Sequence, residues 1–232
     1  MKIGILQTGR TPVELRAKHG DYDDLFRAFL AGQGFTFETF AVLDGVLPAG
    51  PNDADGWLIT GSRFGVYEGH PWIAPLESFL RAVYAKGVPI IGVCFGHQIL
   101  AQALGGKVEK FSGGWSVGAT QYDTDTGSKR IMAWHQDQVT QPPKDARVAG
   151  HTDFCENAIL VYGDKALTMQ PHPEFTPEFM VDLLDARGVV LPPETAQSAR
   201  KGMSAELATE DIADMFAEFL RRPRPDVTNN AP

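Results

Sequence analysis

VPIIGVCFGHQILAQALGG, residues 88–106, decides the fold, because three structural signals follow one another in it. Val88 to Val93 is a continuous apolar run, as expected for a central strand that is covered on both faces. Phe95 to Leu104 then has apolar residues at helical spacing, and this helix is expected to stop at the two glycines that follow. Cys94 therefore lies where a buried strand ends and a helix begins.

A cysteine at such a junction is a candidate nucleophile. Gly92 and Gly96 flank it, and glycines let the backbone make a tight turn and pass close by. The first N–H groups of the following helix would stabilise a thiolate, and the N–H of Phe95 would supply one donor of an oxyanion hole. The alternative is a small buried cysteine of a sheet, and the turn by itself leaves both interpretations open.

Strand-like and helical segments alternate through the first half of the chain. This order implies a mostly parallel sheet with helices on both faces. The predicted strands are Lys2–Leu6, Phe35–Val42 and Gly56–Thr60, and the predicted helices are Tyr22–Ala31 and Pro71–Lys86.

The second half has a different character. From Lys107 to about Thr168, strand-like pieces are separated by turn-rich segments such as residues 124–130 (TDTGSKR) and 140–145 (TQPPKD), which predicts an antiparallel decoration on one side of the sheet. Helical patterning returns at Thr176–Ala186 and Ala205–Leu220.

Composition excludes several classes of protein. The 232 residues carry Lys+Arg 21 against Asp+Glu 29, a net charge of −8, which argues against a surface for nucleic acid or anionic lipid. No stretch is apolar for long enough to span a membrane, and the start lacks the features of a signal peptide. We therefore expect a cytoplasmic protein. Two cysteines 61 positions apart argue against a disulfide scaffold and a cysteine zinc site, and no metal or cofactor is predicted.

A second cluster follows a strand-like run, Ala166 to Gln170. Residues 170–174 read QPHPE, and in an extended backbone His172 and Glu174 project to the same side. A carboxylate beside an imidazole fixes its tautomer and supports the imidazolium that forms when it takes a thiol proton. An ordinary turn would also explain this segment alone, but a cysteine turn together with a downstream His-x-Glu is a much rarer combination.

These segments resemble the class I glutamine amidotransferase family, of the stand-alone GMP-synthase-like or γ-glutamyl hydrolase type. Residues 92–98 (GVCFGHQ) match the pattern around the family's nucleophile, and QPHPE matches the other half of its triad. Residues 59–68 (ITGSRFGVYE) are similar to the family's oxyanion loop, although Ser62-Arg63 stands where many members have Gly-Pro. Residues 135–139 (HQDQV) are similar to a further family segment.

The resemblance implies a flavodoxin-like α/β fold and a role for each matching position. Cys94 would be the nucleophile, His172 the base and Glu174 its orienter. The oxyanion hole would be formed by backbone N–H groups of Ser62 and Phe95, helped by Gly61, and substrate would be bound by Gln98, Trp115 and Ser116.

The resemblance also implies a division of the chain and a reaction. Residues 1–186 would be the amidotransferase domain, 187–222 a helical extension packed on it, and 223–232 a mobile tail. Attack on glutamine would give a γ-glutamyl thioester and ammonia, and a separate synthetase subunit would have to accept the ammonia, because no nucleotide-binding loop is present.

Three alternatives stay open from the sequence. The chain could be a free-standing hydrolase of other γ-glutamyl amides or peptides, a cysteine α/β-hydrolase, or a catalytically silent binding or redox module. The acid two residues after the histidine counts against the α/β-hydrolase, and a complete triad counts against the silent module. Among the other candidates, Cys155 is expected to be packing, His97 to lie at the surface or support the site, and His135 to lie in a loop near the site.

Overall fold

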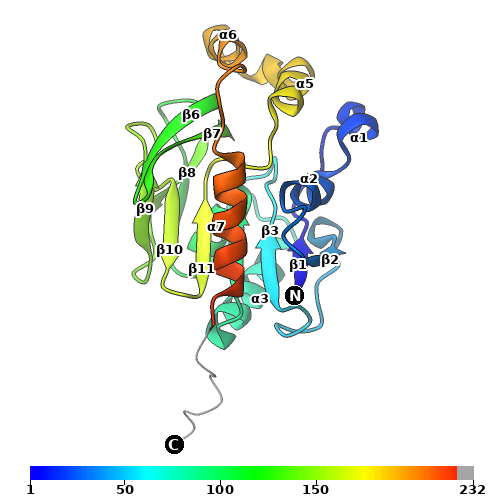
Figure 1. Cartoon of the computed structure of the whole chain (residues 1–232). Helices are drawn as coiled ribbons and strands as arrows, with labels where there is room; N and C mark the ends of the chain where they lie inside the picture. The colour runs from blue at the N-terminus through cyan, green and yellow to red at the C-terminus, as the bar shows by residue number, and fades with distance from the viewer. Residues whose placement is uncertain (224–232) are drawn as a thin grey trace, which may run out of the picture.

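The computed structural model describes residues 1–223, which form one nine-stranded sheet flanked by helices (Figure 1). The strand order is β2-β1-β3-β4-β11-β10-β9-β6-β7, and β5 and β8 pair separately. Along this order, each neighbouring pair from β2 through β4 to β11 is parallel. Each remaining pair, from β11 through β10 to β7, is antiparallel. The mostly parallel sheet with an antiparallel decoration is therefore confirmed. From residue 224 onward, the predicted tail lies outside the described residues.

The bounds of the elements follow. The strands are β1 (Lys2–Leu6), β2 (Thr36–Phe40), β3 (Gly56–Ile59), β4 (Ile90–Val93), β5 (Lys107–Lys110), β6 (Ser116–Thr124), β7 (Gly127–His135), β8 (Asp137–Gln141), β9 (Arg147–His151), β10 (Ile159–Tyr162) and β11 (Ala166–Met169). The α-helices are α1 (Val13–His19), α2 (Tyr22–Phe29), α3 (Ile73–Lys86), α4 (Phe95–Ala103), α5 (Pro177–Arg187), α6 (Pro193–Lys201) and α7 (Thr209–Arg221), and the 3₁₀ helices are η1 (Val42–Asp44) and η2 (Gly188–Val190).

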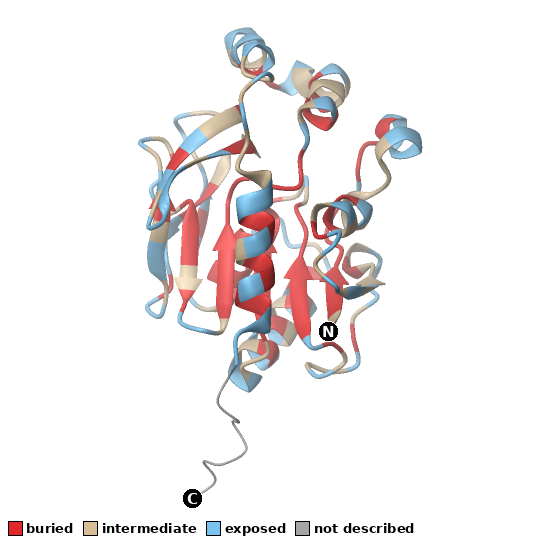
Figure 2. Ribbon diagram, viewed as in Figure 1, coloured by how far each residue is buried: buried red, intermediate tan, exposed pale blue. Residues whose placement is uncertain are grey.

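The central parallel strands are buried on both faces, which explains their continuous apolar sequences (Figure 2). Successive residues of a strand point to opposite faces, so Trp57 and Ile90 pack with α3 and α4, whereas Leu58 and Ile91 pack with α2 and α7. Each face of the sheet thus has its own hydrophobic layer.

One prediction about the second half was wrong. Residues 124–130 were expected to be a turn-rich connection, but the turn takes up only residues 125–126 and Gly127 already begins β7. The β6–β7 hairpin pairs Ser116 with His135 at its far end, so His135 closes a strand and does not lie in a loop. The polar residues at the start of β7 face solvent, and this exposure hid the strand from an analysis of hydrophobic pattern.

A third hydrophobic cluster lies beyond the carboxyl ends of the parallel strands, where Figure 1 shows α1, α5 and α6 gathered. It joins Leu15 of α1, Phe179 of α5, Ala199 of α6 and Met132 of β7. The short helices α1 and α6 were not predicted individually, because each buries only one residue. The domain boundary at residue 186 stays a prediction.

Candidate active site

Cys94 has a strained backbone at the turn between β4 and α4. Its φ of 54° and ψ of −106° make it the one non-glycine residue with positive φ among residues 1–223. Such conformations cost about 1–3 kcal/mol and persist where the surroundings hold them. Here Cys94 N–H donates to the Met169 carbonyl over 2.8 Å, and a Cβ on Gly96 would lie 2.4 Å from the Ile59 carbonyl oxygen. Close packing of β3, β4 and β11 therefore holds the turn in place.

His172 and Glu174 meet as expected, but the extended backbone predicted for this segment was wrong. Residues 173–174 form a turn, in which Phe175 N–H donates to the His172 carbonyl over 3.3 Å. The Nδ1–H of His172 donates to Oε1 of Glu174 over 2.7 Å, and both side chains are buried. The ring of Phe175 stacks on the imidazole with centroids 4.0 Å apart, and His172 N–H donates to the Met132 carbonyl over 2.7 Å. These contacts fix the orientation of the imidazole.

Burial disfavours the charged imidazole, but the charges of Glu174 and Cys94 and hydrogen bonds to both groups raise the pKa of His172 to about 10. The side chains converge at Gly61, where an added Cβ would lie 2.8 Å from Cε1 of His172 and 3.7 Å from the Cβ of Cys94. Only a glycine leaves room for both there.

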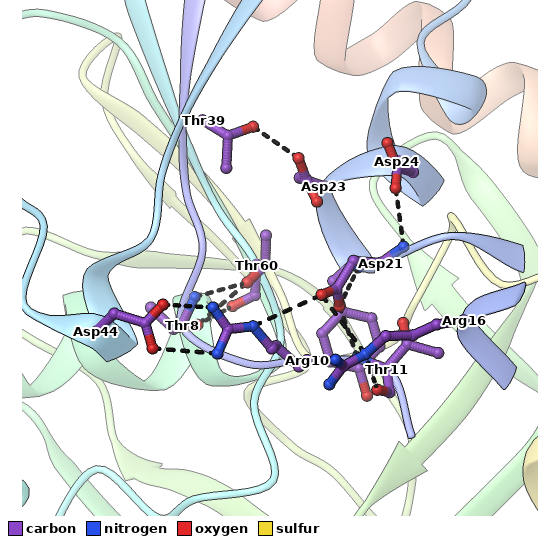
Figure 3. Close-up of polar contacts among 11 residues, drawn as sticks. Thr8, Arg10, Thr11, Arg16, Asp21, Asp23, Asp24, Thr39, Asp44 and Thr60 are labelled. Atoms are coloured by element: carbon purple, nitrogen blue, oxygen red, sulfur yellow. Dashed lines mark hydrogen bonds and ion pairs between the residues drawn. The ribbon is translucent and has the colours of Figure 1, made fainter. Parts of the chain in front are cut away.

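The loop after β3 forms one wall of the site. Thr8 ties it to the loop after β1, since its N–H donates to the Thr60 hydroxyl over 3.0 Å and its hydroxyl donates to the Thr60 carbonyl over 2.9 Å (Figure 3). Ser62 follows and lines the cavity, whereas Phe95, the first residue of α4, is fully buried. Ser62 thus lies at the cavity and Phe95 directly follows Cys94, and their roles as oxyanion donors stay a prediction.

Gln98 has a defined orientation. Its Nε2 donates to the Asp137 carbonyl and to Oε1 of Gln170, both over 3.0 Å. Both amide protons are used, so its Oε1 is the group left to accept a hydrogen bond from a ligand. Of the other predicted substrate residues, Trp115 lines the cavity and Ser116 does not.

The site opens into a cavity of about 800 Å³. This size lies in the upper part of the range of roughly 300–1,000 Å³ that holds drug-sized ligands. Several lining residues were missed from sequence, namely Arg10, Arg16, Tyr22 and Arg187. Ligands of open α/β sheets bind outside the carboxyl ends of the strands, and this rule could have indicated Arg10, which follows β1. Nothing in the sequence indicated the residues on the helices.

Two further histidines are buried, and one of them, His135, lines the cavity, in agreement with its expected place near the site. His97 was expected at the surface or in a supporting position. It is fully buried, with Nδ1 2.8 Å from the Thr168 hydroxyl, so the surface position was wrong and the supporting role stays a prediction. Burial lowers the pKa of His97 to about 3, and it does the same for His135, which is also buried. Cys155 is buried as expected, and burial raises its pKa to about 12.

Neither a metal-binding cluster nor a membrane-spanning helix is present among residues 1–223. In this range, no three side chains of His, Cys, Asp or Glu lie close enough together to hold a metal ion. Each helix in this range is also too short or too polar to span a bilayer.

Comparison with known proteins decides the family. The family model for class I glutamine amidotransferases matches residues 50–184, which include the cysteine turn and the His-x-Glu segment. The chain belongs to the class I glutamine amidotransferase family. Two family patterns recognised in the sequence, around Cys94 and around His172, thus lie side by side at the carboxyl ends of the adjacent strands β4 and β11.

Relatives within this family include peptidases. Gamma-glutamyl peptidase 2 of Arabidopsis thaliana is 29% identical over 74% of this chain and 75% of its own. A glutamine amidotransferase-like protein of Schizosaccharomyces pombe is 32% identical over 94% of this chain and 98% of its own. A solved glutamine amidotransferase from Methylobacillus flagellatus has the same fold, with a TM-score of 0.76, 22% identity, and coverage of 94% of this chain and 92% of that one.

Proposed function

We propose that this class I amidotransferase relative hydrolyses γ-glutamyl amides through a thioester on Cys94. The observation that supports it is that Cys94 and His172 line one cavity and that the buried Glu174 is hydrogen-bonded to His172. A nucleophile, a base within reach and a group that orients the base are the arrangement needed for covalent catalysis.

The proposed reaction has two halves. The Cys94 thiolate adds to the amide carbon, and the N–H groups of Ser62 and Phe95 stabilise the oxyanion, with Gly61 leaving room for it. The C–N bond breaks as the leaving nitrogen takes a proton from His172. Water then loses a proton to His172 and attacks the thioester, and this step releases glutamate and restores the thiolate.

We propose amides larger than glutamine as the natural substrates. The cavity of about 800 Å³ is larger than free glutamine requires, and gamma-glutamyl peptidase 2 is among the relatives. In this proposal Gln98 accepts a hydrogen bond from the α-ammonium of the γ-glutamyl group, and Trp115 belongs to the wall around that group. Ser116 lies outside the cavity lining and has no part in this proposal.

A second candidate is hydrolysis of glutamine with transfer of ammonia to a separate synthetase subunit. The match of residues 50–184 to the amidotransferase family favours it. In that case glutamine itself would be the preferred substrate, and a partner would have to lie over the open cavity to collect ammonia.

Steady-state glutamate release by the purified chain distinguishes these functions. Glutamine is compared with γ-glutamyl anilide and γ-glutamyl dipeptides, with Cys94→Ala as the control. We expect faster turnover of the larger amides and complete loss in Cys94→Ala. Turnover of glutamine alone would favour the ammonia-transferring function. Activity that survives in Cys94→Ala would exclude the thioester.

A further inference from the structure

Charge is unevenly distributed around the cavity. Glu68 and Asp137 supply its acidic side chains, and the cations Arg63 and Lys110 lie near them. Asp137 lies beside Gln98, which donates to its carbonyl. A different part of the lining carries three arginines, and no acidic side chain of residues 1–223 lines this part. We call it the amine side, and it consists of Arg10, Arg16, Tyr22, Phe175 and Arg187.

The amine side lies next to the proposed base. The ring of Phe175 stacks on His172 at 4.0 Å and on Tyr22 at 6.3 Å. Because His172 would protonate the leaving nitrogen, the substituent on that nitrogen leaves toward this side of the cavity. The γ-glutamyl group would occupy the opposite side, beside Gln98.

Arg10 and Arg16 are held together by one carboxylate. Oδ2 of Asp21 lies 3.8 Å from Nε of Arg10 and 3.8 Å from Nε of Arg16 (Figure 3). Oδ1 of Asp21 accepts from Thr11 N–H over 2.7 Å and from Tyr22 N–H over 2.9 Å. Asp21 is thus anchored to the backbone and shared between two guanidinium groups.

The terminal nitrogens of the arginines differ in their partners. Those of Arg10 pair with Asp44, and Nη1 of Arg187 pairs with Glu14 over 2.8 Å. Nε of Arg16 donates to the Thr11 carbonyl over 2.9 Å, but its two terminal nitrogens have no acceptor among the described residues. A guanidinium presents such nitrogens as a fork that matches a carboxylate. Among the three arginines of the amine side, Arg16 is therefore the one whose two terminal nitrogens are left to bind a carboxylate.

We propose that the amine side binds the carboxylate of the leaving amine, with Arg16 as its main contact. Preferred substrates would then be γ-glutamyl amino acids or short γ-glutamyl peptides that have a free C-terminal carboxylate. This inference rests on the proposed function and adds to it the chemical class of the leaving group. Ammonia, the leaving group of glutamine, has no carboxylate and cannot use the contact.

A matched pair of substrates tests the inference. γ-Glutamylglycine and γ-glutamylglycinamide differ only in the terminal carboxylate, and kcat/KM is measured for both. A hydrogen-bonded charge pair in a partly enclosed site predicts a preference of about ten- to a hundredfold for the free carboxylate. Equal values for the two substrates in the wild-type chain would overturn the inference.

Arg16→Gln is expected to bring the ratio of the two kcat/KM values close to one, and Arg16→Lys to give an intermediate ratio. Lys18→Gln is the matched control, because Lys18 lies on the same helix but pairs with Glu178 and Asp182 outside the cavity. It should keep the wild-type ratio. An unchanged ratio in Arg16→Gln would contradict the assignment of Arg16.

Calorimetry on Cys94→Ala separates the inference from the proposed function. Tighter binding of γ-glutamylglycine than of its carboxamide supports the carboxylate site without any turnover. If the wild-type chain hydrolyses neither compound, nor glutamine or γ-glutamyl anilide, the proposed function fails. If it hydrolyses both compounds equally well, only the inference fails.

Discussion

Nε2 of Gln98 donates to Oε1 of Gln170 over 3.0 Å, so the cysteine segment and the His-x-Glu segment are joined by a buried hydrogen bond. The two glutamines are 72 positions apart in the chain. They meet because β4 and β11 are parallel neighbours that pair Val93 with Met169. This hydrogen bond directs the Nε2 group of Gln98 toward Gln170, so Oε1 is the end of the amide left for a ligand.

Gln170→Leu should weaken substrate binding more than it slows the chemical step. Without the acceptor, the Gln98 amide can rotate and present its N–H group to the substrate ammonium. Loss of one buried hydrogen bond predicts a rise in KM of about five- to tenfold. The measurement is KM and kcat for a γ-glutamyl amide and for its glutaryl analogue, which has no α-ammonium. Gln138→Leu is the control, since Gln138 is buried but bonds the Phe154 carbonyl. An equal KM change for both substrates would contradict this role.

Glu174→Gln should reduce activity and change its pH dependence. Glu174 raises the pKa of His172, so removing its charge lowers that pKa toward the ordinary value of about 6.5. We expect kcat to fall about a hundredfold or more, because imidazolium beside the thiolate becomes less stable. The rate of Cys94 alkylation, followed against pH, checks the shift. The same pH profile in Glu174→Gln and the wild type would show that Glu174 does not set the charge state of His172.

His97 and His135 should make the fold sensitive to acid. Both have pKa values lowered to about 3 by burial, whereas the unfolded chain takes up these protons near pH 6.5. Below about pH 6.5 the unfolded state therefore binds more protons, and the free energy of unfolding falls as the pH falls. The loss is about 1.4 kcal/mol per pH unit for each histidine at most.

His172 does not add to this acid effect. Its folded pKa is raised, so the stability it contributes is present below about pH 6.5 and is lost as the pH rises toward about 10. Urea unfolding at about pH 6.5 and about pH 5 measures the acid slope, and His97→Gln should reduce it by about half. A slope that is unchanged in this variant would assign the effect to other groups.

Gly96→Ala should destabilise the chain and disturb the Cys94 turn together. The added Cβ would lie 2.4 Å from the Ile59 carbonyl oxygen, so α4 must move away from β3. Overpacking of this kind costs about 1–3 kcal/mol. Gly50→Ala is the control, because its Cβ would meet no heavy atom within 4 Å. Thermal unfolding and kcat of both variants are the measurements, and a Gly96→Ala protein with wild-type stability and kcat would contradict the predicted clash.

Several features could be predicted from local sequence because their causes are local. The buried strand before Cys94 and the helix after it have their own hydrophobic periodicity. His172 and Glu174 meet because they are two residues apart on one short turn. The parallel sheet follows from the alternation of strands and helices. The β7 strand was missed because its first residues are polar and exposed, so hydrophobic pattern could not distinguish them from a turn.

By itself, the sequence thus determined the class of fold, the family and the candidate triad, since each depends on short segments whose order and spacing are visible along the chain. Only the tertiary structure decided the rest of the site. Asp21 holds Arg10 and Arg16 together, Gln170 orients Gln98, and Arg187 reaches the same cavity from α5. These contacts depend on which strand ends lie side by side and on how the helices pack beyond them, and no local pattern encodes either.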